Sequence, residues 1–171
     1  MKKKVLLVAI IIVTCSFSVF SQINRTIHDE KTGNDILYGY CTRQALENHG
    51  DGWFKAEYES YTVKTETFNF ELPEKFDSVQ VFMGTWESNS RREVPRFCKI
   101  FDLDYFKDIP VTFICLDSKI TVDVLNVEDY YVQFLPAIVF YKKGEELCRF
   151  LEQPRTESME SDIMDLMERM Q

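Results

Sequence analysis

The side chains best placed for chemistry lie in Trp86-Glu87-Ser88-Asn89-Ser90, where a short apolar run gives way to a long helical pattern. A turn from a strand into a helix puts side chains next to unpaired backbone N–H groups and the partial positive charge of the helix N-terminus. The carboxylate of Glu87 can accept hydrogen bonds from those N–H groups, which is its simpler role. It can also serve as a general acid or base, but its sequence neighbours offer only hydroxyl and amide groups as partners.

Other catalytic or metal-binding patterns have little support in the sequence. The two histidines, His28 and His49, both lie in the N-terminal third, so Ser-His-Asp and Cys-His arrangements are not indicated. No Cys-x-x-Cys or His-x-x-x-His spacing occurs. Asp102, Asp104 and Asp108 lack the glycine and the final glutamate of a calcium loop, so we interpret them as a solvated helix end. We therefore expect no metal and no cofactor.

The elements that position Glu87 can be predicted from hydrophobic patterning. Val79–Met83 and Val111–Leu116 are apolar runs with little alternation, as expected of parallel strands buried on both faces. The helical pattern between them predicts the crossover that parallel neighbours require. Pro95 lies inside this helix and should bend it. Its sheet-facing side should carry Val94, Phe97, Cys98 and Phe101, and its solvent side Arg91, Arg92, Glu93 and Arg96.

Further elements are predicted on either side of this unit. Residues 22–35 are polar and lack periodicity, which is typical of a tail. Helices are expected over 42–48 and over 53–61, where an aromatic stripe should dock the second helix on the domain. The alternation in Thr67–Leu72 predicts a half-exposed edge strand. Residues 117–133 are less regular, with a helical turn predicted over 127–131.

The order and spacing of several parts resemble the thioredoxin family, and most of all secreted thioredoxin-like proteins of Bacteroidetes-type bacteria. In that family the strand ends in Trp-Cys-x-x-Cys, with a proline eight residues after the first cysteine. Here Glu87 and Ser90 stand where the two cysteines would be, and Pro95 follows Glu87 by eight residues. Leu135-Pro136 matches the family's cis-proline before a strand, and a glycine turn, an antiparallel strand and a closing helix follow. The resemblance covers about residues 68–171.

The resemblance implies an α/β fold of the thioredoxin type, with a central mixed sheet of four to five strands flanked by helices and an N-terminal helical extension. Together with the signal peptide expected over 1–21 from the N-terminal residues, it divides the chain into that signal peptide, a tail and helical extension (22–66) and a thioredoxin-like domain (67–171). It also implies a peptide-binding groove formed by Trp86, Leu135 and Pro136, in which a partner's extended backbone pairs beside the cis-proline.

The departure from the family at Glu87 and Ser90 removes the ordinary dithiol reaction. A carboxylate does not attack a disulfide usefully, and the pKa of a serine hydroxyl is too high for a resolving anion. Cys98 lies eleven residues after Glu87, roughly 16 Å away along a helix. The sequence thus favours a redox-inactive module that binds an extended peptide or a partner protein over an enzyme. The alternative is a thiol–disulfide oxidoreductase-related enzyme that uses a non-standard cysteine such as Cys41.

Cysteine usage leaves two possibilities open. The cysteines after residue 21 are Cys41, Cys98, Cys115 and Cys148. Because Cys115 and Cys148 lie in apolar strand patterns, we expect free, buried thiols. One disulfide is the other possibility, with Cys41 expected to be the most exposed of the four.

The N-terminus predicts export. Three lysines, an apolar run over 5–13 and compact residues before Gln22 are typical of a signal peptide cut before Gln22, which leads to a periplasmic or secreted protein with no integral membrane span. Lipid attachment at Cys15 fits less well, because threonine precedes it. Residues 1–21 hold no acidic residue, so the cleaved chain carries 17 basic and 28 acidic residues. That excess of acids argues against a nucleic-acid partner.

Overall fold

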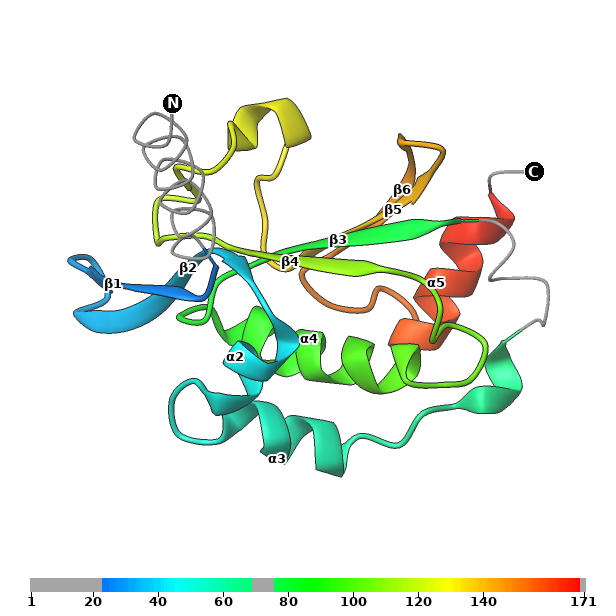
Figure 1. The fold of residues 1–171 in the computed structure, drawn as a ribbon. Helices are drawn as coiled ribbons and strands as arrows, with labels where there is room; N and C mark the ends of the chain where they lie inside the picture. The colour runs from blue at the N-terminus through cyan, green and yellow to red at the C-terminus, as the bar shows by residue number, and fades with distance from the viewer. Residues whose placement is uncertain (1–22, 69–75, 170–171) are drawn as a thin grey trace, which may run out of the picture.

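The computed structural model describes residues 23–68 and 76–169 (Figure 1). In this part of the chain, six strands form one mixed sheet in the order β1-β2-β4-β3-β5-β6. The strands are β1 (Arg25–Asp29), β2 (Asn34–Cys41), β3 (Ser78–Met83), β4 (Val111–Cys115), β5 (Ala137–Lys142) and β6 (Glu145–Leu151). The helices are α2 (Arg43–Asn48), α3 (Trp53–Ser60), α4 (Ser88–Phe101) and α5 (Met159–Glu168), with 3-10 turns η1 (Thr65–Thr67) and η3 (Val127–Tyr130). The chain is therefore an α/β protein whose mixed sheet is flanked by helices.

The predicted crossover lies at the centre of the sheet. Strands β3 and β4 are parallel, with Val79 opposite Val111 and Met83 opposite Cys115, and α4 connects them. Strand β5 runs antiparallel to β3, and β6 antiparallel to β5. The interpretation of the apolar runs as central strands is thus confirmed.

The prediction of a tail over residues 22–35 was wrong. Strands β1 and β2 form an antiparallel hairpin there, and β2 also pairs antiparallel with β4 through Gly39 opposite Cys115. The hairpin reverses at Gly33, which has φ of 68° and donates a hydrogen bond from its N–H to the Asp29 carbonyl. These two strands raise the strand count to six, so residues 22–66 contribute to the sheet as well as providing α2 and α3.

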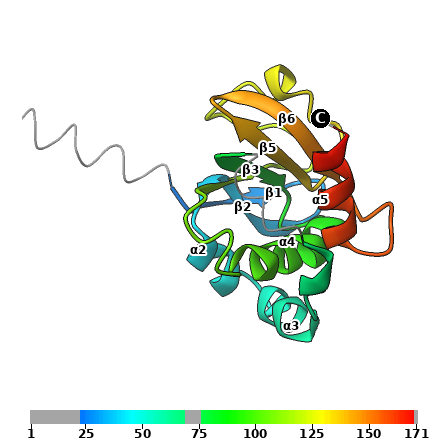
Figure 2. The same cartoon turned by 90° about the vertical axis from the view of Figure 1, so that its right-hand side faces the viewer.

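The two faces of the sheet are covered in different ways (Figures 1 and 2). Side chains alternate along each strand, so Val81 and Met83 of β3 pack with the helices while Phe82 packs on the opposite face. Helix α4 lies directly against the first face, and α3 packs on the outside of α4. The segment 117–136, which contains η3, covers the second face. The helical turn predicted over 127–131 is confirmed by η3.

Helix α4 agrees with its predicted pattern except at one position. Val94, Phe97, Cys98 and Phe101 are buried, as expected, and Pro95 lies inside the helix. Glu93, expected to face solvent, is only 1% exposed. Its Oε1 accepts hydrogen bonds from Arg92 and Arg96, so two neighbouring guanidinium groups compensate the buried charge.

Two sequence predictions fall partly or wholly on residues that the structure does not describe. Thr67 lies in the 3-10 turn η1, not in the predicted edge strand, and residues 69–72 of that strand are outside the described residues. The expected signal peptide, including Cys15, is also outside them. Over 23–68 and 76–169, no helix is both long enough and apolar enough to span a membrane.

Candidate functional site

The turn between β3 and α4 holds Trp86 against the second face of the sheet. The indole Nε1–H donates a 3.0 Å hydrogen bond to the carbonyl of Leu116, the residue after β4. The Glu87 N–H donates to the Gly84 carbonyl at 3.0 Å and closes the turn. A Cβ atom at residue 84 would lie 2.6 Å from the Trp86 Nε1, so the indole leaves room there for glycine alone. Trp86 thus forms a fixed, half-buried wall.

Glu87 is the N-cap of α4. Its Oε1 accepts a hydrogen bond from the Asn89 N–H at 2.8 Å, and its Oε2 accepts one from the Ser90 N–H at 2.6 Å. Both carboxylate oxygens therefore satisfy N–H groups that have no partner within the helix. This geometry matches the simpler of the two roles expected for Glu87, which is N-capping of the helix. Over the described residues, the hydroxyl of Ser88 is the other side-chain group that hydrogen-bonds to it.

Ser90, at the position of the family's second cysteine, is fully buried. Its Oγ accepts a 3.2 Å hydrogen bond from the Gly84 N–H, which ties the first turn of α4 to the end of β3. The hydroxyl is therefore a structural group beneath the turn. The side chains of Glu87 and Ser90 are both hydrogen-bonded to backbone N–H groups at this turn and at the start of α4.

The Leu135–Pro136 peptide bond is cis, as predicted, and it leads directly into β5. Leu135 packs among the buried residues of the second face, with Trp86 partly buried against the same cluster. The Pro136 carbonyl accepts a hydrogen bond from the Glu152 N–H at 2.9 Å. Trp86 and Leu135 of the predicted groove therefore pack on the same side of the sheet, and Pro136 follows Leu135 directly.

The backbone before the cis bond is unpaired. No N–H or carbonyl of Val132, Gln133, Phe134 or Leu135 is hydrogen-bonded to another residue in the described part of the chain. Phe134 is 50% exposed, although large aromatic side chains usually gain from burial. The residues 132–135, which we call the open segment, thus present free backbone groups and an exposed ring next to Pro136.

The cysteines do not approach this site. All four thiols are free, and Cys41, Cys98 and Cys115 are buried while Cys148 is partly exposed. The prediction that Cys41 is the most exposed cysteine was wrong, because its strand, β2, lies inside the sheet and turns the side chain toward the helices. Cys41 belongs to the core on the α4 side of the sheet, whereas Trp86 and Leu135 pack on the opposite side.

The environments of Cys98, Cys115 and Cys148 also disfavour thiolates. Burial raises the pKa of Cys98 to about 12 and that of Cys148 to about 12. The pKa of Cys115 is raised by its hydrogen bond with the Cys41 thiol and by burial. Because the thiolate is the reactive form, these cysteines are poor nucleophiles at neutral pH.

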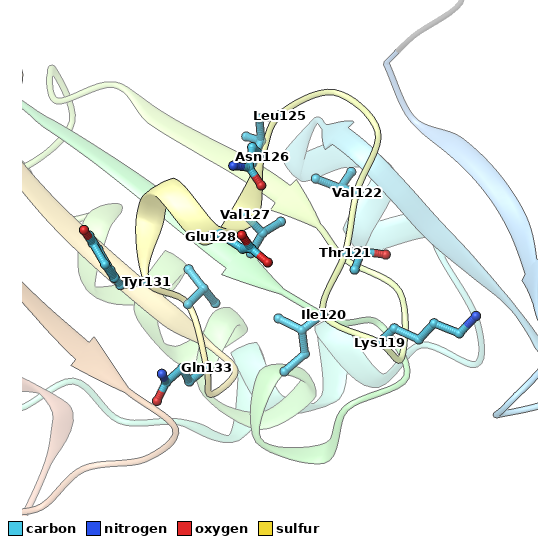
Figure 3. Close-up of a pocket in the computed structure, with 11 residues that line it drawn as sticks. Lys119, Ile120, Thr121, Val122, Leu125, Asn126, Val127, Glu128, Tyr131 and Gln133 are labelled. Atoms are coloured by element: carbon cyan, nitrogen blue, oxygen red, sulfur yellow. The ribbon is translucent and has the colours of Figure 1, made fainter.

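Two hollows adjoin the site, and the sequence did not indicate either of them. The larger, about 680 Å³, lies within the segment 119–133 on the second face (Figure 3). The smaller, about 280 Å³, lies beside Trp86 and is also lined by His49, Trp53 and Arg91. Burial and the nearby Arg91 lower the pKa of His49. Among the described residues, no group of three or more potential metal ligands is present.

Comparison with known proteins gives a fold likeness and no function. No protein-family model matches the chain, and no curated protein matches it. Among solved structures, it is similar to a 1.5 Å crystal structure of a protein of unknown function from Pseudomonas aeruginosa. The match has a TM-score of 0.52 and 14% sequence identity, and it covers 74% of this chain and 89% of the other. At this identity the likeness concerns the fold alone.

Proposed function

We propose that the chain is an exported thioredoxin-like protein without a catalytic dithiol, and that it binds an extended segment of a partner protein beside Leu135–Pro136. The parts on which the resemblance rests follow in family order: β3, the Trp86 turn, the helix with Pro95, the cis bond before β5, antiparallel β6 and closing helix α5. Strands β1 and β2 are additions at one edge of this arrangement. Export rests on the sequence of residues 1–21.

The observation that carries the binding function is the open segment. Its backbone N–H and carbonyl groups have no partner among the described residues, and they adjoin a fixed tryptophan and a partly exposed phenylalanine. An extended peptide can satisfy such groups by pairing as an added strand, and this interaction needs no thiol. Glu87 and Ser90 contribute by holding the Trp86 turn and the helix start in place.

Binding to short immobilised peptides of varied sequence tests this function. Strand addition predicts that N-methylation of alternate peptide residues abolishes binding, because alternate N–H groups face the protein. Phe134→Ala should weaken binding by about tenfold, since an aromatic contact is lost. Tyr105→Ala is the matched control, because Tyr105 is 42% exposed and follows α4 on the connection to β4. If no peptide binds, or if N-methylation has no effect at any position, strand addition at the open segment is excluded.

The absence of redox chemistry has a separate test. We expect no catalysis of insulin reduction by the protein, and some catalysis by the double variant Glu87→Cys, Ser90→Cys, which supplies the attacking and resolving thiols. A rate comparable with that of an intact dithiol relative, measured on the unmodified protein, would contradict the proposal.

Thiol labelling distinguishes this proposal from the alternative, an oxidoreductase-related enzyme that uses Cys41. Because Cys41 and Cys115 are buried and the pKa of Cys98 is raised to about 12, we expect these three to react with iodoacetamide only after unfolding. Cys148 should react slowly, because its pKa is also raised. Mass spectrometry of native and unfolded samples counts the labels. Rapid alkylation of native Cys41 would favour the enzyme alternative.

A further inference from the structure

The larger hollow, which we call the apolar hollow, is walled by side chains of the segment 119–133. Its walls are the aliphatic residues Ile120, Val122, Leu125, Val127 and Val132, and its edges are polar. In Figure 3 the chain loops around an open space, and Ile120, Val127 and Glu128 border it. Its volume of about 680 Å³ lies within the range of roughly 300–1,000 Å³ typical of ligand pockets. The space is large enough for an aliphatic side chain.

One acidic side chain at the hollow has no partner among the described residues. The carboxylate of Glu128 makes no hydrogen bond or ion pair with any other described residue, whereas the neighbouring acids are already paired. Asp117 accepts from the Thr121 N–H, Asp123 pairs with Arg25, and Asp129 accepts from Asn126. The Lys119 ammonium points away from the open space in Figure 3. The hollow therefore combines aliphatic walls with one carboxylate, that of Glu128, which can pair with a cation.

An exposed aromatic ring stands at the other side of Glu128. Tyr131 is 80% exposed and lines the hollow at the end of η3. Its backbone carbonyl accepts a hydrogen bond from Arg149, which fixes the position of the residue from the side of β6. A carboxylate and an aromatic ring are each favourable contacts for a lysine or arginine side chain.

The hollow is continuous with the open segment. Val132 and Gln133 belong to both, so a strand paired along residues 132–135 would pass over the edge of the hollow. Because side chains of a strand alternate between its two faces, every second residue of that strand would point toward the hollow. Backbone pairing along the open segment does not depend on the partner's sequence. The hollow contacts the partner's side chains, so it can select among partner sequences.

We infer that the apolar hollow is the specificity pocket of the proposed binding site, and that it selects partner segments in which an aliphatic side chain is accompanied by lysine or arginine. The aliphatic side chain enters the hollow and the cation pairs with Glu128. This inference rests on the proposed function. The net charge of −8 for the whole chain has the sign that attracts such a segment.

Four labelled peptides of equal length test the inference by fluorescence anisotropy. They combine leucine or serine at the central position with lysine or glutamate at its flanks. The leucine–lysine peptide should bind the protein most tightly. Glu128→Lys should invert the charge preference, weakening the leucine–lysine peptide by about tenfold and strengthening the leucine–glutamate peptide. Thr121→Trp, which places a large ring at the edge of the hollow, should remove most of the preference for leucine over serine, again about tenfold.

Asp108→Lys is the matched control. Asp108 is an exposed acid that precedes β4, whereas the hollow follows β4, so the two charges lie at opposite ends of that strand. The control makes the same change in net charge and should leave the charge preference unchanged. Circular dichroism of each variant establishes that it is folded, which is expected because residues 108, 121 and 128 are exposed.

The outcomes separate the two proposals. If all four peptides bind equally to the protein and to Glu128→Lys, while Phe134→Ala still weakens them, the binding function stands and the specificity pocket is overturned. If Asp108→Lys alters the preference as strongly as Glu128→Lys, the effect is one of net charge and the pocket is again overturned. If none of the peptides binds, the proposed function fails and the inference falls with it.

Discussion

At the scale of single residues, Glu87 carries out the task that serine, threonine or aspartate performs at many helix N-termini. Its two oxygens accept hydrogen bonds from two successive N–H groups at 2.8 and 2.6 Å. The same position in the family that the chain resembles holds an attacking thiol. Both side chains lie at a helix N-terminus, which favours negative charge, but their chemistry differs.

Replacing Glu87 tests this capping role. Glu87→Ala should lower the free energy of unfolding by about 1 kcal/mol, because two N–H groups at the start of α4 lose their acceptors. Urea unfolding followed by circular dichroism measures the change. Glu87→Asp should retain most of the stability, since a shorter carboxylate still caps a helix. An alanine variant as stable as the parent would show that water replaces the cap without cost.

At the scale of elements, Asp29 ties the β1–β2 hairpin to the segment that follows β4. Its Oδ1 accepts hydrogen bonds from the N–H and hydroxyl of Thr32, and its Oδ2 accepts from the N–H and hydroxyl of Ser118. Burial alone would raise the pKa of Asp29, but these hydrogen bonds outweigh burial and hold the pKa well below its usual value of 3.8. The hairpin is thus joined to the beginning of the segment 117–136.

This carboxylate predicts a pH dependence of stability. A folded-state pKa below the unfolded one stabilises the fold above about pH 4, and the stabilisation is lost as pH falls through the folded-state value. Asp29→Asn removes the effect, so the variant should be less stable than the parent at pH 7, and the difference should shrink between about pH 5 and pH 2. Thermal unfolding of both proteins across this range measures it. A constant difference would mean that Asp29 does not titrate with folding.

The elements with strong local signals were predictable from the sequence. The aliphatic run of β3, the helix around Pro95 and the turn at η3 each depend on neighbouring residues, and each was found where its pattern placed it. The 53–61 helix is α3, and it packs on α4 through its aromatic side as expected. The cis bond at Pro136 was predicted from the resemblance, because nothing local distinguishes it from a trans bond.

The structural features that the sequence did not predict depend on tertiary contacts. Strand β1 has the sequence RTIHD, which is too polar to indicate a strand, and it is stabilised by pairing with β2. Cys41 is buried because β2 pairs with β4, and Glu93 is buried because Arg92 and Arg96 compensate its charge. The apolar hollow arises from the path of the segment 117–136 over the sheet, which an irregular sequence does not specify.

At the scale of the whole molecule, the two faces of the sheet differ in how their cover is stabilised. The α4 side is a continuous core of helices, rich in phenylalanine. The opposite side is covered by a segment with few backbone hydrogen bonds of its own, and its open segment has none to other described residues. Such regions open more easily than the strands and helices they cover.

Hydrogen exchange should reveal this difference. We expect the amides of residues 132–135 to exchange within seconds and those of β3 and β4 to be the slowest, since the latter are paired on both sides. Mass spectrometry after proteolysis measures both. Adding the leucine–lysine peptide should protect residues 132–135, whereas slow exchange there in the free protein would show that their N–H groups already have acceptors.

The place of β2 in the sheet sets a limit on how this protein can be dissected. Because β2 pairs with one side of β4, a fragment that begins at residue 67 would make β4 an unpaired edge strand. Its unsatisfied backbone amides and its aliphatic side chains could then pair with a second molecule. Such a fragment should aggregate instead of folding. Residues 23–66 are therefore part of the folded scaffold, and any shortened version must retain them.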